Sequence, residues 1–288
     1  MRRFGVSTHL FHGERLQPAH LAAIAGSGFE AMELFATKTH FDYHDPAAVR
    51  TLARWLRDAG LEMPSVHAPI VQSLVNDAWG RAYSTATRDA GAWQDMIAEM
   101  RAALEIARYI PFSRFVIHLG IPDAQKPDAN DNSRDAALRS IEEIHRMAEP
   151  LGVTLALEVM GNALSTADAL VDLIENDLDG MKLGICMDVG HAFLLGDPAE
   201  AIEAAGGYLI STHLHDNARQ RDDHLVPFQG AIDWPGTVMA FEKIGYDGVF
   251  MFEIKNQQST AATLERAVRA RQRLETLAGS LELEAGSW

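Results

Sequence analysis

Histidines and carboxylates stand at the ends of successive apolar, strand-like runs of this chain. The first three runs are PSVHAP, RFVIHLG and TLALEVMGN, which carry His67, His118 and Glu158. The pattern continues in GICMDVGHA, STHLHDN, the loop segment RDDHL and VFMFEIK, with Asp188, His191, His213, His215, Asp222, His224 and Glu253. Segments of helical length separate the runs, so we expect these side chains to converge at one end of a barrel.

Four of these residues form a set of oxygen and nitrogen donors: Glu158, Asp188, His213 and Glu253. Such donors suit Mn, Mg, Co, Fe or Zn better than a soft metal. Any one of them alone is as often a hydrogen-bonded buried polar group. A cluster of inward-facing acids is different, because buried carboxylates are strongly unfavourable unless a cation balances them. The set therefore predicts a divalent metal site.

Spacing leaves the roles of the other histidines open. His213 and His215 share one strand face, so spacing does not say which would bind the metal. His67 and His118 end earlier strands and could hold a second ion or hydrogen-bond the first set of ligands.

Three further residues have a structural as well as a functional interpretation. Asp222 and His224 are two residues apart in a loop, which is also the pattern of a solvated turn. His9 follows the first predicted strand and could touch a substrate. Cys186 lies in an apolar run, which predicts a core residue rather than a nucleophile.

Composition limits the class of partner. The 288 residues carry a formal net charge of -15, which disfavours broad binding to nucleic acid or an anionic membrane. No apolar run is long enough to span a bilayer, and the start of the chain predicts a first strand rather than a signal peptide. The single cysteine allows no intrachain disulfide. We therefore expect a cytoplasmic protein, with neither nucleic acid nor a membrane as partner.

Strand-like and helix-like segments alternate along the chain. The predicted strands are Phe4–Thr8, Ala31–Leu34, Glu62–His67, Arg114–His118, Thr154–Glu158, Leu183–Asp188, Tyr208–Leu214 and Gly248–Glu253. Eight strand–helix units predict an α/β fold, a (β/α)8 TIM barrel in a single domain of residues 1–279 with a C-terminal tail, residues 280–288. A doubly wound open sheet is the alternative, and the convergence of polar strand ends favours the closed barrel.

Local signals place individual side chains. Ser133 and Ser165 are predicted to be the N-caps of two helices. In LALEV, Ala156 and Glu158 share one strand face and the two leucines share the other. Glu158 should therefore point into the barrel, while the leucines pack against helices.

The motifs HAP, HLG, LEVMGN, MDVGHA, HLHDN, DDHL and FEI resemble those of the xylose isomerase-like barrel superfamily. Its members include endonuclease IV, hydroxypyruvate isomerase, inosose dehydratase and the ketose 3-epimerases. The resemblance spans about Ser65 to Glu253, and it is specific for the superfamily but poorly specific for the reaction. It implies a divalent metal cofactor (Mn, Zn, Mg, Co or Fe), with one to three ions per chain.

The resemblance also implies roles for individual positions. Matching the one-metal sugar enzymes implies metal ligation by Glu158, Asp188, His213 and Glu253, and substrate contacts by His191 and Arg219. Matching the three-zinc pattern of endonuclease IV adds further ligands: His67, His118, His191, Asp222 and His224. On this alignment His213 is the ligand, which leaves His215 to contact substrate.

This chain departs from the family at three positions. Leu164 stands where ketose 3-epimerases carry a substrate-contacting Glu, and Ile70 stands where endonuclease IV has an aromatic residue that helps to hold DNA. Phe228 stands at the first glycine of a PGxG loop. The first two differences disfavour a free-ketose 3-epimerase and a DNA endonuclease, and Phe228 is expected to reshape the mouth of the pocket.

We expect a metal-dependent isomerase or epimerase, or a related dehydratase, that moves a proton next to the carbonyl of a sugar or sugar phosphate. Glu158 and Glu253 are the expected acid and base, one on each side of the reacting carbon. The alternative is an endonuclease IV-like multi-metal phosphoesterase or hydrolase. The expected partner is a small carbohydrate, and an exposed apolar helix face could pair two chains into a homodimer. A binding protein or a purely structural metal is the third alternative, which the position of the ligands at the catalytic face of the barrel disfavours.

Overall fold

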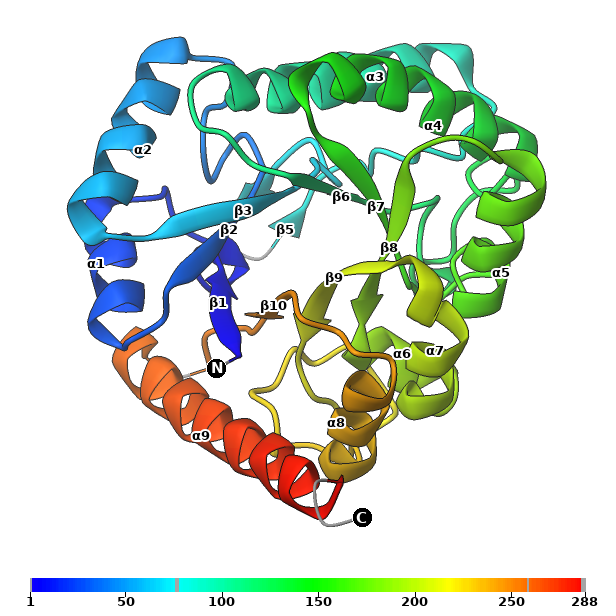
Figure 1. The fold of residues 1–288 in the computed structure, drawn as a ribbon. Helices are drawn as coiled ribbons and strands as arrows, with labels where there is room; N and C mark the ends of the chain where they lie inside the picture. Colours follow the sequence, from blue (N-terminus) through cyan, green and yellow to red (C-terminus); the bar gives the residue numbers. More distant parts are fainter. Residues whose placement is uncertain (1, 76–77, 258, 286–288) are drawn as a thin grey trace.

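The computed structural model describes residues 2–75, 78–257 and 259–285. Its centre is a closed barrel of eight parallel strands in the order β1-β10-β9-β8-β7-β6-β3-β2 (Figure 1). The barrel strands are β1 Arg3–Ser7, β2 Ala31–Phe35, β3 Glu62–His67, β6 Arg114–Ile117, β7 Thr154–Glu158, β8 Leu183–Asp188, β9 Leu209–Leu214 and β10 Val249–Phe252. The single-domain (β/α)8 barrel predicted from the sequence is therefore confirmed, and the open sheet is excluded.

Helices surround the barrel and cover the outer face of its strands (Figure 1). They are α1 Pro18–Gly26, α2 Pro46–Ala59, α3 Ala90–Leu104, α4 Arg134–Ala148, α5 Ala167–Asp172, α6 Val189–Leu195, α7 Pro198–Ala205, α8 Trp234–Lys243 and α9 Thr260–Ala285. None of these helices has the length and apolarity needed to traverse a bilayer. Residues 280–285 of the segment assigned to a tail continue α9, and residues 286–288 lie outside the described residues.

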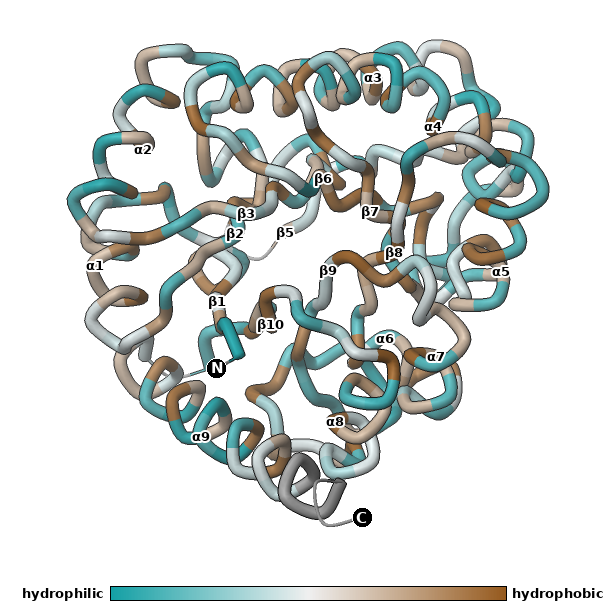
Figure 2. The backbone as a smooth tube through the Cα atoms, in the orientation of Figure 1, coloured by the Kyte–Doolittle hydropathy of each residue, from teal (hydrophilic) through white to brown (hydrophobic). Residues whose placement is uncertain are grey.

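Helix α2 shows how local sequence sets these elements. The side chain of Asp45 accepts a hydrogen bond from a first-turn backbone N–H, and Gly60 ends the helix with a left-handed φ of 67°. Val49, Leu52 and Leu56 are buried on one face, and each contributes roughly 1.5–3 kcal/mol when fully buried. Figure 2 shows the same division, with mostly brown strands inside and helices that alternate brown and teal outside.

One of the two predicted helix starts is confirmed and the other is not. Ser133 is the N-cap of α4, but its hydroxyl makes no capping bond and accepts a hydrogen bond from Arg88 Nε at 2.9 Å. The N-cap of α5 is Thr166, whose hydroxyl accepts from the Ala169 N–H. The prediction of Ser165 was wrong because its hydroxyl donates to the Leu119 carbonyl at 3.1 Å, a tertiary contact that the local sequence does not show.

Small apolar side chains fill the barrel below the polar strand ends. Val116, Ala156 and Cys186 form a separate buried cluster, with Ile210 packed against it. Ala156 lies on the face that Glu158 shares, two residues earlier, as the alternation in LALEV predicts. Cys186 is a fully buried free thiol, and burial raises its pKa to about 12, so the prediction of a core residue is confirmed.

Candidate metal centre

The ends of β7, β8, β9 and β10 bring together the four predicted ligands Glu158, Asp188, His213 and Glu253, all buried. His213 Nδ1 lies 3.4 Å from Glu158 Oε1, 3.5 Å from Glu253 Oε2 and 3.9 Å from Asp188 Oδ2. The four residues meet because the carboxyl ends of parallel strands share one edge of the barrel. We call this set the central group.

A second group lies beside it, at the ends of β3 and β6. His67 Nε2 and His118 Nε2 are both 3.2 Å from Glu158 Oε2. Glu158 therefore belongs to both groups, with one carboxylate oxygen facing each. We call His67, His118 and Glu158 the inner histidine group.

A third group is built around the loop after β9. It consists of His191, His215, Asp222 and His224, and we call it the loop group. Asp222 Oδ2 is 3.1 Å from both His191 Nε2 and His224 Nε2, and the rings of His215 and His224 stack at 4.1 Å. Asp222, with 38% of its side chain exposed, is the outermost member. Asp222 and His224 thus lie close to His191 and His215, and their role as metal ligands stays a prediction.

Backbone carbonyls fix the ring orientation of three histidines in these groups. His67 Nδ1 faces the Ala68 carbonyl at 2.9 Å, His191 Nδ1 the Val159 carbonyl at 3.1 Å, and His224 Nδ1 the Glu253 carbonyl at 2.8 Å. A carbonyl oxygen can only accept a hydrogen bond, so Nδ1 carries the proton in each ring. In the neutral ring, Nε2 then keeps the lone pair that can bind a metal.

Asp188 connects the central group to the loop group. It is the N-cap of α6, where Oδ1 accepts from the His191 backbone N–H at 2.7 Å. Its carboxylate also lies 2.9 Å from His215 Nε2. His215 thus contacts a ligand of the central group and does not replace His213 in it.

Glu33, on β2, was missed by the sequence analysis. It is fully buried, and its Oε1 and Oε2 lie 3.0 and 3.2 Å from His213 Nε2. The signal in the sequence is a lone acid in the apolar run AMELF, the same pattern as Glu158 in LALEV. His9 also lies at this end, with its ring 4.5 Å from that of His224.

The donor atoms are arranged as a divalent cation requires. Among the described residues, both oxygens of Glu158 and Nδ1 of His213 are buried without a hydrogen-bond partner, although each lies 3.2–3.4 Å from other donors. Donors bound tetrahedrally at roughly 2.0–2.1 Å from one ion are about 3.3–3.4 Å apart. The residues of the central group therefore fit a divalent metal.

The electrostatics of the groups are consistent with this fit. Burial alone would raise the pKa of Glu158, but positive charge on His118 and His213 holds it well below its usual range. Burial alone would lower the pKa of His67, but the Glu158 carboxylate outweighs it and raises this pKa to about 9. Without an ion, the buried carboxylates thus favour protonated histidines, whose positive charge balances theirs. A bound cation would balance the carboxylates instead, and the histidines would release these protons.

Arg219 packs against the end of α6. Its guanidinium donates to the Gly196 carbonyl at 2.8 Å and lies over the Phe193 ring at 4.7 Å. Its backbone φ of 63° follows the sharp turn of the loop. The structure thus places Arg219 on the exposed rim, and its contact with a substrate stays a prediction.

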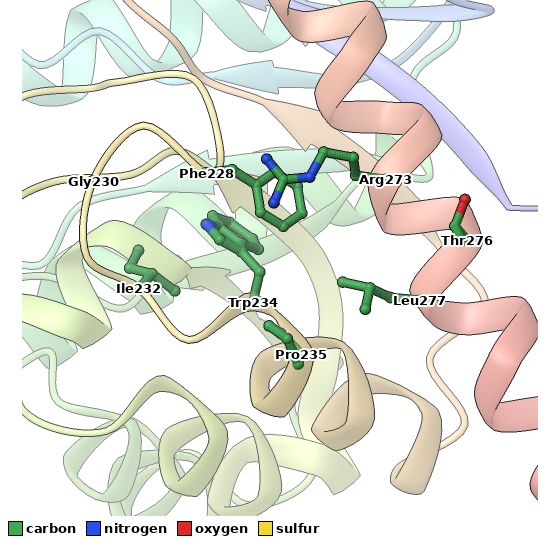
Figure 3. A pocket seen from close by; sticks show the side chains of 8 residues that line it. All are labelled: Phe228, Gly230, Ile232, Trp234, Pro235, Arg273, Thr276 and Leu277. Atoms are coloured by element: carbon green, nitrogen blue, oxygen red, sulfur yellow. The ribbon is translucent and has the colours of Figure 1, made fainter.

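Phe228 lines a separate cavity of about 460 Å³ between its loop and α9 (Figure 3). Arg273, from α9, lies over the Phe228 ring at 3.7 Å, and Trp234 packs beside it at 5.6 Å. The cavity is lined by Phe228, Gly230, Ile232, Trp234, Pro235, Arg273, Thr276 and Leu277, none of them an acid or a histidine. Phe228 thus packs toward α9, and its predicted effect on the pocket mouth stays untested.

The fold and the donor groups together define a (β/α)8 barrel with buried acid–histidine clusters, which fit a divalent metal, at the carboxyl ends of its strands. A family model described as "Xylose isomerase-like TIM barrel" matches residues 21–278, and the chain belongs to this family.

Its relatives include sugar isomerases and epimerases. An uncharacterized protein of Methanocaldococcus jannaschii is 30% identical over 271 residues, which cover 91% of this chain and 87% of that protein. Inosose isomerase of Bacillus subtilis is 24% identical over 191 residues, which cover 63% of this chain and 68% of that protein. A crystal structure of a D-tagatose 3-epimerase-like protein superposes with a TM-score of 0.79 at 26% identity, covering 98% of this chain and 99% of that one.

Proposed function

We propose that this protein is a divalent-metal-dependent isomerase or epimerase of a sugar or sugar phosphate, or a related dehydratase, that transfers a proton next to a carbonyl. The central group carries the proposal, because carboxylates from three strands converge on one unpartnered histidine nitrogen. Relatives named inosose isomerase and D-psicose 3-epimerase support the class of reaction. A similar fold solved as the IOLI protein with a zinc atom supports the metal.

The central group would hold the ion through Glu158, Asp188, His213 and Glu253. A divalent ion bound there would polarise a substrate carbonyl and balance the negative charge that develops on its oxygen. The protein itself supplies the proton acceptor and donor.

We assign the two proton transfers to Glu253 and Glu158. Glu158 is surrounded by His67, His118 and His213 at 3.2–3.4 Å, so its charge is already shared among several partners. Glu253 Oε2 has its described histidine neighbours farther away, at 3.5 and 3.9 Å. Glu253 is therefore the better first base, and Glu158 faces the reacting carbon from the other side.

His191 and His215 would orient substrate hydroxyls from the loop group, and Arg219 would meet a phosphate from the rim. Leu164 is half-buried and brings no polar atom to this region, so we place inosose and sugar phosphates ahead of free ketohexoses as substrates. The cytoplasmic location and the homodimer stay predictions.

Exchange of a substrate proton with solvent tests this proposal. The metal-loaded wild type, Glu158→Gln and Glu253→Gln are incubated in D2O with inosose, D-psicose, D-tagatose and phosphorylated ketoses, and deuterium next to the carbonyl is followed by NMR. We expect exchange in the wild type and its loss in both variants, with the fold retained by circular dichroism. Normal exchange in both variants would refute the assignment of the two carboxylates as acid and base.

The inner histidine group and the loop group favour a second function, phosphoester hydrolysis by two or three metals. All nine residues of the endonuclease IV pattern lie within the three groups, and clustered metals can clamp both oxygens of an in-line displacement. The net charge of -15 disfavours DNA as the substrate. A nicking assay on abasic duplex DNA with metal-loaded protein tests this function, and the absence of nicking would remove it.

A further inference from the structure

Glu33, Ser65 and His213 form a hydrogen-bonded chain across three strands of the barrel. Glu33 on β2 and Ser65 on β3 are paired in register, and Ser65 Oγ donates to Glu33 Oε2 at 2.7 Å. The same carboxylate accepts from Nε2 of His213, on β9, at 3.0 and 3.2 Å. All three side chains are at most 2% exposed, so water does not compete for these bonds.

The chain determines which nitrogen of His213 is free. An ionised carboxylate can only accept, so Nε2 must carry the proton in its bond with Glu33. In the neutral ring that binds a metal, Nδ1 then presents its lone pair on the opposite side, where it faces the carboxylates of Glu158, Asp188 and Glu253 and has no hydrogen-bond partner. Ser65 restrains the Glu33 carboxylate through its hydrogen bond to Oε2.

We propose that Glu33, supported by Ser65, is a positioning residue that orients His213 and raises the basicity of its Nδ1 as a metal ligand. The inference rests on the proposed central group. A histidine ligand whose second nitrogen donates to a carboxylate is held in one tautomer and one ring orientation, and it binds metal more tightly. His67, His191 and His224 donate Nδ1 to backbone carbonyls, and His215 Nε2 faces Asp188, which itself belongs to the central group. His213 differs from these four because its second nitrogen faces a carboxylate that lies outside the three groups, Glu33.

Glu33→Gln tests the role of the charge with almost no change of shape. Metal-free protein is titrated with Co2+ alone, and binding is followed by the visible absorption of the bound ion. We expect Glu33→Gln to weaken Co2+ binding about 10–100-fold, and Ser65→Ala to weaken it less, in the same direction. Glu62→Gln is the matched control, because Glu62 is an exposed carboxylate on the same strand as Ser65, and its affinity should equal that of the wild type.

A second readout reports the tautomer directly and does not require the variant to fold. In 15N-histidine-labelled wild type loaded with Zn2+, long-range 1H–15N NMR should show His213 protonated on Nε2 and unprotonated on Nδ1. In Glu33→Gln the Nε2 resonance should shift toward that of a neutral hydrogen bond. A proton on Nδ1 in the wild type, or an unchanged Co2+ affinity in Glu33→Gln, would overturn the inference.

His213→Gln separates this inference from the proposed metal site. We expect it to abolish Co2+ binding in the central group. If His213→Gln binds Co2+ as the wild type does, the metal site itself is wrong and the role of Glu33 falls with it. If His213→Gln loses the ion while Glu33→Gln does not, the metal site stands and only the role of Glu33 is refuted.

Discussion

Glu158→Gln should remove most of the stabilisation that a metal gives this protein. Glu158 is shared by two groups, with Oε2 at 3.2 Å from His67 and His118 and Oε1 at 3.4 Å from His213. Glutamine keeps the shape, but it removes the charge and replaces one oxygen with an NH2 group that cannot bind a cation. Both groups therefore lose a ligand.

The expected magnitude follows from linkage between binding and folding. An ion at about 100 times its Kd stabilises the wild type by about 2.7 kcal/mol, which corresponds to a rise in Tm of roughly 4–5 °C for a protein of 288 residues. If the lost ligand weakens binding at least ~100-fold, the same ion concentration is close to the new Kd and contributes only about 0.4 kcal/mol. The rise in Tm should then fall to about 1 °C or less.

Thermal unfolding with and without Zn2+, followed by circular dichroism, measures this difference. Glu253→Gln should keep part of the rise, because the inner histidine group does not include Glu253. Glu142→Gln, an exposed carboxylate on α4, is the control and should behave as the wild type. A full rise in Tm for Glu158→Gln would refute Glu158 as a ligand of the ion.

Three further changes test particular contacts by chemical denaturation. Burial lowers the pKa of His40 from 6.5 to about 4 in the folded protein. As the pH falls below 6.5, His40 therefore takes up a proton in the unfolded chain but not in the folded one, and by pH 5 the folded state has lost about 2 kcal/mol of stability. His40→Asn should lose about 2 kcal/mol less than the wild type between pH 7 and pH 5, and an equal loss in the two proteins would contradict this. In Gly190→Ala the added Cβ would lie 2.0 Å from His215 Cε1, which should cost about 1–3 kcal/mol, and unchanged stability would refute the close contact. Trp234→Phe removes the Nε1–H bond to Asp216 Oδ2 at 2.9 Å, while Oδ1 still accepts from two backbone N–H groups. The buried Oδ2 that loses its partner should cost about 1–3 kcal/mol, and a change below ~0.5 kcal/mol would contradict the importance of this bond.

The sequence predicted the barrel because its strands are short apolar runs flanked by long periodic helices. The predicted and observed strands of β3, β7 and β8 coincide, and the others differ by one residue at one or both ends. The hairpin of β4 Leu74–Val75 and β5 Ala78–Trp79 was not predicted, since strands of two residues carry no alternating pattern.

The side chains that converge at the site were predictable to the extent that they end strands. His118, Glu158 and Asp188 were identified in this way, and they lie at the carboxyl ends of β6, β7 and β8. Glu33 was not found, because a lone acid in an apolar strand becomes informative only once the barrel places it against His213, 180 positions away. The tautomers of the histidines were equally beyond the sequence, since they depend on which backbone carbonyl faces each ring.

The most direct test of the proposed reaction compares metal-free and metal-restored wild type in D2O. The protein is stripped with a chelator, reloaded with Mn2+, Co2+ or Zn2+, checked for metal per chain by elemental mass spectrometry, and given inosose and the sugar phosphates. The account predicts at least one bound equivalent, and deuterium next to the substrate carbonyl only after metal is restored. Metal-loaded protein that exchanges no proton in any of these substrates, but hydrolyses a phosphodiester, would contradict it.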